Sequence, residues 1–327
     1  MAVEQSGALL SVAELKKHYN INFSLFGRPT RQVKAVDGIT FDLFRGETLS
    51  IVGESGCGKS TVGKTIAGLL SPTQGEVFLN GERIDTLSAS QFRQRRKKIQ
   101  VVFQDPYSSL DPRMRVRDIL AEPMRNFGLA KSRADVDRRV AEILDMVQLP
   151  KDAGGRLPHE FSGGQRQRIG IGRALAAEPE IIICDEAVSA LDVSVKAQVV
   201  NLLQELKDRL GLSLLFISHD LAIVDHITDR VAVMYLGKIV ELGPRQSLFS
   251  NPRHPYTQAL LSAVPTPDVG IKRERIILKR DVPSPANPPS GCAFHTRCPV
   301  AFDRCRVEAP VLKTVAERHT ASCHLTG

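Results

Sequence analysis

The sequence predicts an α/β fold in which parallel strands alternate with crossover helices. Short apolar runs have the length and composition of buried strands, at residues 48–52, 181–184, 212–217 and 231–235. Helical patterns follow or separate these runs, at residues 59–70, 195–210 and 221–227. A glycine-rich loop joins the first run directly to its helix. Strands that alternate with helices in this order are typical of a parallel sheet.

The N-terminal part predicts a second, antiparallel group of strands. Residues 9–15 and 33–43 place β-branched and apolar residues between polar ones, as strands do. Residues 23–32 contain Gly27 and Pro29 and indicate a loop. Asn80 and Gly81 separate two short strand-like runs and favour a tight hairpin turn. We therefore expect an antiparallel β subdomain in addition to the parallel sheet.

The middle and the end of the chain differ in character from this core. Residues 105–161 predict a mainly helical subdomain, since Val136, Val140 and Ile143 recur at helical spacing and Ser132 is suited to cap a helix. Four prolines between residues 281 and 290 mark a linker into a small cysteine-rich C-terminal extension. We therefore divide the chain into a domain at residues 1–265 and a linker with its extension at residues 266–327.

Composition excludes several classes of protein. The 44 Lys and Arg against 36 Asp and Glu give a charge of +8, a mild excess that a solvated surface explains. No apolar run reaches the roughly 18–20 residues of a membrane-spanning helix, and residues 1–10 lack the pattern of a secretory signal. The basic run at residues 93–98 has no interleaved aromatic side chains for base stacking. We expect an intracellular protein with no nucleic-acid partner.

The strongest motif is a phosphate-binding loop that fits G-x-x-x-x-G-K-[ST] between a strand and a helix. Its residues are Gly53, Glu54, Ser55, Gly56, Cys57, Gly58, Lys59, Ser60 and Thr61. Glycines let the backbone N–H groups surround a phosphate chain, and the helix that follows adds its positive end. We expect Lys59 to reach the β- and γ-phosphates of a nucleotide and the Ser60 hydroxyl to bind Mg²⁺.

Further polar groups follow predicted strands. Asp185 and Glu186 follow the apolar run at residues 181–184, so Asp185 is the expected second Mg²⁺ anchor and Glu186 can orient or deprotonate an attacking water. Gln104 follows the expected strand at residues 99–103, and His219 follows residues 212–217. Because all four lie at carboxyl ends of strands, where α/β sheets bind ligands, we expect one shared site.

A second helix start has the character of an anion site. It comprises Ser162, Gly163, Gly164 and Gln165. The chain already has one phosphate loop, so a second phosphate-facing helix start is explained if each nucleotide lies between two subunits.

These motifs, in this order over residues 9–243, resemble the ATP-binding cassette (ABC) ATPases. The resemblance implies an ABC-type nucleotide-binding core that binds and hydrolyses ATP as a head-to-tail pair of subunits. Two ATP molecules then lie between the phosphate loop of one subunit and residues 162–165 of the other. The resemblance also implies Glu186 as general base, His219 as γ-phosphate sensor and Gln104 as a magnesium contact. Asp192 matches the family's D-loop, and Tyr19 matches the residue that stacks on adenine, with Phe26 as the alternative.

Residues 104–114 and 251–261 narrow the resemblance to the ATPase subunits of dipeptide, oligopeptide and nickel importers. This implies a subunit that powers import through two separate membrane permease subunits, with an extracytoplasmic solute-binding protein and an identical or paralogous second ATPase. It would sit peripherally on the cytoplasmic face of the inner membrane. The alternative is a non-transport ABC ATPase acting on DNA or ribosomes. Such proteins usually carry two cassettes or a long coiled-coil insertion, which this sequence lacks.

The C-terminal cysteines predict a metal site. Cys292, Cys298, Cys305 and Cys323 crowd into the last 36 residues. Four thiolates can hold zinc or an iron–sulfur cluster, and the spacing does not choose between them. His295, His319 and His324 keep a mixed zinc site open, and four unligated thiols are the remaining alternative. The resemblance to the peptide-importer ATPases implies a [4Fe-4S] cluster, with zinc as the alternative.

Overall fold

The computed structural model describes residues 7–23, 29–105, 107–264 and 275–326. Contacts divide the chain into two compact units. The first comprises Met1–Leu43, Thr48–Asp85 and Ser218–Gly327, and the second comprises Phe44–Glu47 and Thr86–Ile217. The predicted boundary at residue 265 lies outside the described residues, and the predicted division into two domains stays a prediction.

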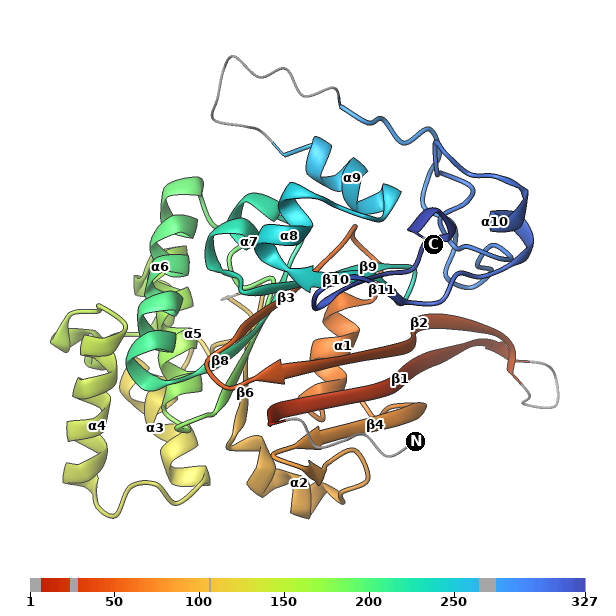
Figure 1. The fold of residues 1–327 in the computed structure, drawn as a ribbon. Coiled ribbons are helices and arrows are strands. Elements are labelled where there is room, and N and C mark those ends of the chain that lie inside the picture. The colour runs from red at the N-terminus through yellow and green to blue at the C-terminus, as the bar shows by residue number, and fades with distance from the viewer. Residues whose placement is uncertain (1–6, 24–28, 106, 265–274, 327) are drawn as a thin grey trace. The chain divides into compact units, whose positions relative to one another are not determined.

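The first unit contains an antiparallel sheet with strand order β2-β1-β4-β5. Its strands are β1 (Ala8–Phe23), β2 (Pro29–Phe44), β4 (Gln74–Leu79) and β5 (Glu82–Arg83). Register pairs Leu10 with Leu79 and Val12 with Val77, and these four side chains are buried. The hairpin at Asn80 and Gly81 is confirmed. The predicted strands at residues 9–15 and 33–43 were too short, because β1 and β2 continue through polar residues (Figure 1).

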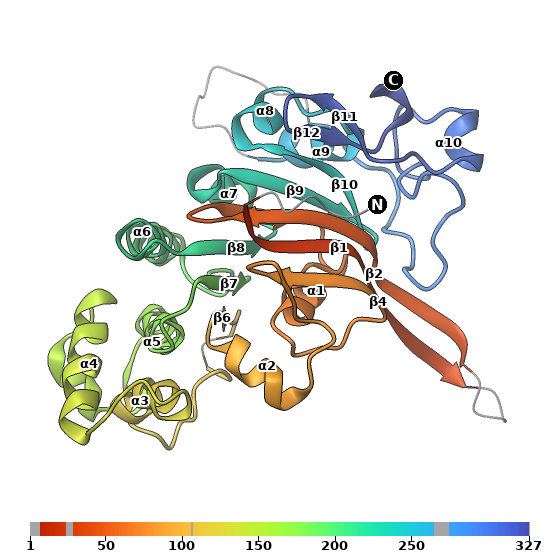
Figure 2. The ribbon, with the colours of Figure 1, turned by 60° about the horizontal axis from the view of Figure 1, so that its bottom comes forward.

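The same unit contains a second set of strands, which runs in the order β11-β12-β10-β9-β3. These are β3 (Thr48–Val52), β9 (Arg230–Tyr235), β10 (Lys238–Pro244), β11 (Lys313–Ala316) and β12 (His319–Ala321). β3 and β9 are parallel, whereas the outer three strands pair antiparallel. The last strands of the chain thus belong to the same set as β3, the strand that precedes the phosphate loop. Figure 2 shows β10, β11 and β12 side by side.

Short helices accompany these strands in the first unit. They are α1 (Lys59–Ile66), α7 (Leu221–Ile227), α8 (Arg245–Ser250), α9 (Pro255–Ser262) and α10 (Asp303–Val307), with a 3₁₀ turn η3 (His324–Thr326). α1 is four residues shorter than the predicted helix, whereas α7 has the predicted bounds.

The second unit combines three parallel strands with helices. Its strands are β6 (Ile99–Val102), β7 (Ile181–Asp185) and β8 (Ser213–Ser218). Its helices are α2 (Ala89–Arg96), α3 (Val116–Asn126), α4 (Arg133–Met146), α5 (Gly163–Leu175) and α6 (Val193–Leu210), with 3₁₀ turns η1 (Lys151–Gly155) and η2 (Pro158–Glu160). Both ribbon views place α3, α4 and α5 together (Figures 1 and 2).

Local signals explain the helix boundaries. The Ser132 hydroxyl accepts a hydrogen bond from the Asp135 N–H at 3.1 Å, so the predicted cap of α4 is confirmed. The apolar face that follows, including Val136, Val140 and Ile143, is buried. None of the helices in the part of the chain that the structure describes combines the length and the apolar character needed to span a bilayer.

Candidate nucleotide site

The phosphate loop leaves the fully buried strand β3 and ends where α1 begins at Lys59. Gly58 caps this helix with a φ of 107°, a conformation that residues with a Cβ rarely adopt. A Cβ on Gly58 would also meet the carbonyl oxygen of Ala35 in β2 and lie 2.9 Å from Cε of Met234 in β9. The glycine therefore permits both the turn and the close approach of two strands.

The Lys59 ammonium is buried inside the loop. Its Nζ donates to the carbonyl oxygens of Gly53 at 2.8 Å and Glu54 at 3.0 Å, and only 4% of the residue is exposed. Cys57 lies beside it, and burial raises the pKa of this thiol. A buried ammonium, a glycine cradle and a helix N-terminus together fit a polyphosphate chain. The residues present therefore fit the predicted nucleotide.

Two contacts of the phosphate loop were not predicted from the sequence. The Glu54 N–H donates to the Tyr256 hydroxyl oxygen at 2.9 Å, and the Glu54 carboxylate receives two hydrogen bonds from Arg297. Tyr256 belongs to α9 and Arg297 to the C-terminal segment at residues 275–326. The sequence offers no signal for pairing residues this far apart, since neither belongs to a motif that binds phosphate.

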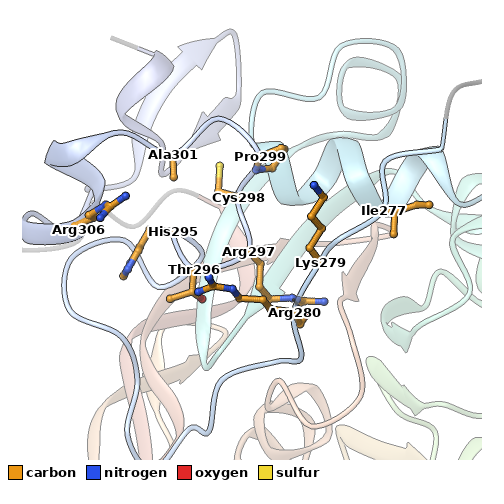
Figure 3. Close-up of a pocket in the computed structure, with 10 residues that line it drawn as sticks. All are labelled: Ile277, Lys279, Arg280, His295, Thr296, Arg297, Cys298, Pro299, Ala301 and Arg306. Atoms are coloured by element: carbon orange, nitrogen blue, oxygen red, sulfur yellow. Dashed lines mark hydrogen bonds between the residues drawn. The ribbon is translucent and has the colours of Figure 1, made fainter.

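A cavity of about 530 Å³ lies within the C-terminal segment (Figure 3). Its lining includes the basic residues Lys279, Arg280, Arg297 and Arg306. In the close-up, Arg280 and Arg297 lie next to each other. The Arg297 guanidinium is held by Glu54 of the phosphate loop, so one wall of this cavity is also a support of the loop.

In the second unit, three predicted residues lie at one edge of the parallel strands. Register pairs Val102 of β6 with Cys184 of β7, so Gln104, Asp185 and Glu186 lie at or just after the same ends of two paired strands. Asp185 is buried, and Glu186 has a φ of 50°. The Glu186 N–H donates to the Ile217 carbonyl oxygen of β8 at 3.0 Å. These three residues thus lie at one edge of the parallel strands, and the shared site that they were expected to form with His219 stays a prediction.

The Ser-Gly-Gly-Gln segment opens α5 as predicted, with a capping box. Ser162 Oγ accepts from the Gln165 N–H at 3.3 Å, while Gln165 Oε1 accepts from the Ser162 N–H at 3.0 Å. A Cβ on Gly164 would collide with Val195 in the first turn of α6. This glycine therefore permits close packing of the two helix starts, a role that sequence reasoning missed. Gly163 lies near the side chain of Leu191. Leu191 is followed by Asp192, the last residue before α6.

The structure divides the remaining predicted residues between the units. His219 and Tyr19 belong to the first unit with the phosphate loop, whereas Asp192 belongs to the second. His219 directly follows β8. Tyr19 lies on β1, is 37% exposed and has the Lys17 ammonium 5.2 Å from its ring centroid. Phe26, the alternative to Tyr19, lies outside the described residues.

Comparison with known proteins shows to which family this chain belongs. The family model described as ABC transporter matches residues 36–189. A second, described as the oligopeptide/dipeptide transporter C-terminal region, matches residues 240–305. The oligopeptide transport ATP-binding protein AppF of Bacillus subtilis is 52% identical over 328 residues, covering 99% of both chains. The chain belongs to the ABC transporter family.

Further ABC proteins agree in sequence and in fold. The oligopeptide transport ATP-binding protein OppF of Salmonella typhimurium is 53% identical over 325 residues, covering 98% of this chain and 97% of that protein. The ATP-binding cassette MJ0796, solved as a post-hydrolysis dimer bound to ADP and Pi, covers 72% of this chain and 98% of its own, with 27% identity and a TM-score of 0.65. CbiO1 of Clostridium perfringens covers 75% of this chain and 92% of its own, with 28% identity and a TM-score of 0.64. The predicted ABC-type α/β fold with an antiparallel sheet and helical elements is thereby confirmed.

The predicted iron–sulfur cluster is wrong for this ABC protein. All four C-terminal cysteines are described, and in the described ranges no group of three or more His, Cys, Asp and Glu side chains is placed to hold a metal ion. Burial raises the pKa of Cys298 to about 11, so without a metal ion this group is a thiol. The similar proteins are named as ATP-binding proteins, with no mention of iron or sulfur. The same arrangement gives the zinc alternative no support.

Proposed function

We propose that this chain is the ATP-hydrolysing subunit of an ABC importer for oligopeptides or a related solute. The observation that carries the proposal is the agreement over almost the whole chain with two oligopeptide transport ATP-binding proteins at 52% and 53% identity. The match to the oligopeptide/dipeptide transporter C-terminal region supports the same substrate class. A role on DNA or ribosomes has no such support. We place the ATPase domain at residues 1–265, its helical subdomain at 105–161, and the linker with its extension at 266–327.

The proposed chemistry is attack of water on the γ-phosphate of ATP, which breaks the bond from the γ-phosphorus to the bridging oxygen and releases ADP and phosphate. Lys59 and the loop N–H groups bind the phosphates, and Glu186 takes the proton of the attacking water. His219 contacts the γ-phosphate. Ser60, Gln104 and Asp185 would hold Mg²⁺, which when bound neutralises charge on the phosphates. Tyr19 stacks on the adenine.

We propose that the second half of each ATP site comes from another ATPase subunit, identical or paralogous. Ser162, Gly163, Gly164 and Gln165 would face the nucleotide of the partner, with Asp192 beside them at the interface. The support is that α5 begins directly after Ser162, so the positive end of the helix dipole lies at these residues. The dimeric state of the similar cassette MJ0796 supports the same arrangement.

Transport requires other chains to form the path through the membrane. We propose two membrane permease subunits, with an extracytoplasmic solute-binding protein that delivers the solute to them. The ATPase then lies peripherally on the cytoplasmic face of the inner membrane. The oligopeptide transport names of the similar proteins support this assembly.

The test is Glu186→Gln, measured as ATP turnover and ATP retention in the purified protein. Removal of a general base should lower turnover by at least about 100-fold while ATP stays bound and dimers accumulate in light scattering. Glu178→Gln is the matched control, because Glu178 is a surface carboxylate with nearly the same φ, 54°, in the same unit. Turnover in Glu186→Gln equal to that of the control would contradict the assigned role.

A further inference from the structure

Glu54 of the phosphate loop is bound by an arginine 243 residues further along the chain. Arg297 Nη1 lies 2.6 Å from Glu54 Oε2, and Nη2 lies 3.0 Å from Oε1. This is the bidentate geometry in which a guanidinium binds a carboxylate most strongly. The Arg297 side chain is 7% exposed and that of Glu54 29% exposed, so water screens the pair less than it screens a surface ion pair.

Arg297 is itself held in place by its surroundings. Its Nε donates to the Arg280 carbonyl oxygen at 2.8 Å, and its guanidinium carbon lies 5.9 Å from the centroid of the Tyr235 ring. Figure 3 shows the Arg297 side chain extended alongside Arg280. The hydrogen bonds with Glu54 raise the pKa of Arg297, so its charge is permanent. The guanidinium is therefore a preorganised support and not a mobile surface group.

Glu54 connects Arg297 to the residues of the phosphate loop. Its side chain binds Arg297, its N–H donates to the Tyr256 hydroxyl at 2.9 Å, and its carbonyl oxygen accepts from Lys59 Nζ at 3.0 Å. The ring of Tyr256 packs against Phe294, with centroids 5.3 Å apart, and Phe294 lies three residues before Arg297. A displacement of the Glu54 side chain would therefore be transmitted to a carbonyl that holds the phosphate-binding lysine.

The ion pair between Arg297 and Glu54 also changes the charge that a bound nucleotide meets. The loop must surround a polyanion, yet Glu54 places a carboxylate within it. An uncompensated carboxylate opposes binding of the nucleotide phosphates, whereas a carboxylate paired to a guanidinium does so far less. We propose that Arg297 is a positioning residue for the phosphate loop, which neutralises Glu54 and thereby makes ATP affinity depend on the C-terminal segment. This inference rests on the proposed ATPase function.

The experiment compares KM and kcat for ATP, and the ATP dissociation constant by equilibrium titration, in four full-length variants. They are Arg297→Ala, Glu54→Gln, the double variant, and Arg304→Ala. Arg304→Ala is the matched control, because Arg304 binds Glu308 bidentately at 2.7 and 2.8 Å in the same segment but on an exposed surface. Arg297→Ala should weaken ATP binding about tenfold, because the unpaired Glu54 carboxylate then repels the phosphates, with kcat changed less than about twofold.

The double variant separates neutralisation of the Glu54 charge from a merely structural role of Arg297. Gln at position 54 carries no charge, so removal of Arg297 then leaves no carboxylate to repel the phosphates, and ATP affinity should return to within about threefold of the parent protein. An arginine that only holds the C-terminal segment together could not be rescued in this way.

Two results would overturn the inference: ATP affinity in Arg297→Ala equal to that in Arg304→Ala, or no recovery in the double variant. A parent protein that binds ATP without hydrolysing it would contradict the proposed function instead, and the titration would still decide the role of Arg297.

Discussion

His254 lies in a position where acid must weaken the protein. The residue is 1% exposed, its ring packs against Phe294, and Nδ1 accepts a hydrogen bond from the Tyr256 N–H at 3.0 Å as the cap of α9. Burial lowers the pKa of His254 from 6.5 to about 4. A protonated ring could not accept the bond from Tyr256, so protonation and the folded cap exclude each other.

The size of the effect follows from the two pKa values. Between pH 6.5 and pH 4 the unfolded chain binds a proton at this ring and the folded chain does not, so the free energy of unfolding falls as the pH is lowered. Acidification from pH 7 to pH 5 should remove about 2 kcal/mol, and the full loss below pH 4 should be about 3 kcal/mol. Above pH 6.5 the ring is neutral in both the folded and the unfolded chain, so His254 no longer makes the free energy of unfolding depend on pH.

Urea unfolding at pH 7, 6 and 5 measures this loss in the parent protein and in His254→Asn. Asn offers a capping acceptor and does not titrate, so it removes the pH dependence of this one position. The variant is expected to be less stable at pH 7, where it leaves space beside Phe294, but to lose about 2 kcal/mol less than the parent on acidification to pH 5. Equal losses in the two proteins would refute the reasoning.

Three further substitutions or measurements test the loop, the cap and the core. Gly58→Ala should abolish ATP binding by titration, whereas Gly46→Ala, at a φ of 70° with open space around its Cβ, should retain it; retention in both would contradict the close-approach argument. Ser162→Ala and Ser132→Ala each remove a helix cap and should each cost about 1 kcal/mol in urea unfolding. Only Ser162→Ala should also lower ATP turnover, by at least about tenfold; equal turnover in both variants would remove Ser162 from the site. Cys184, whose pKa burial raises to about 12, should resist iodoacetamide at pH 8 in the folded protein by mass spectrometry, and labelling as fast as in urea would contradict its burial.

Local chemistry made much of the fold predictable. The residues of β3 and α7 were predicted without error because a short apolar run and a capped helix are each decided by neighbours in sequence. The phosphate loop was predictable for the same reason. The extension of β1 and β2 through polar residues was not, because cross-strand pairing outside a core leaves no hydrophobic pattern.

Long-range contacts limited what the sequence could say about the site. The pairing of Arg297 with Glu54 depends on how distant segments fold together, and no periodicity in either segment indicates it. The cysteine spacing showed that four thiols lie close in sequence, but it could not show whether their side chains converge on one point. Gly164 was read as part of an anion site, whereas its contact with Val195 is visible only once α5 and α6 are placed.

The pairing of β12 with β10 determines when one edge of the sheet can be covered during synthesis of the protein. β10 ends at Pro244, but its outer neighbour β12 begins only at His319, so one edge of the sheet stays open while the ribosome makes the intervening residues. Glu241 of β10 is fully buried in the finished protein and meets the His319 imidazole at 2.8 Å. Until that histidine emerges, the nascent chain carries an unpaired strand edge and an acidic side chain without this partner, a combination that invites aggregation or chaperone binding.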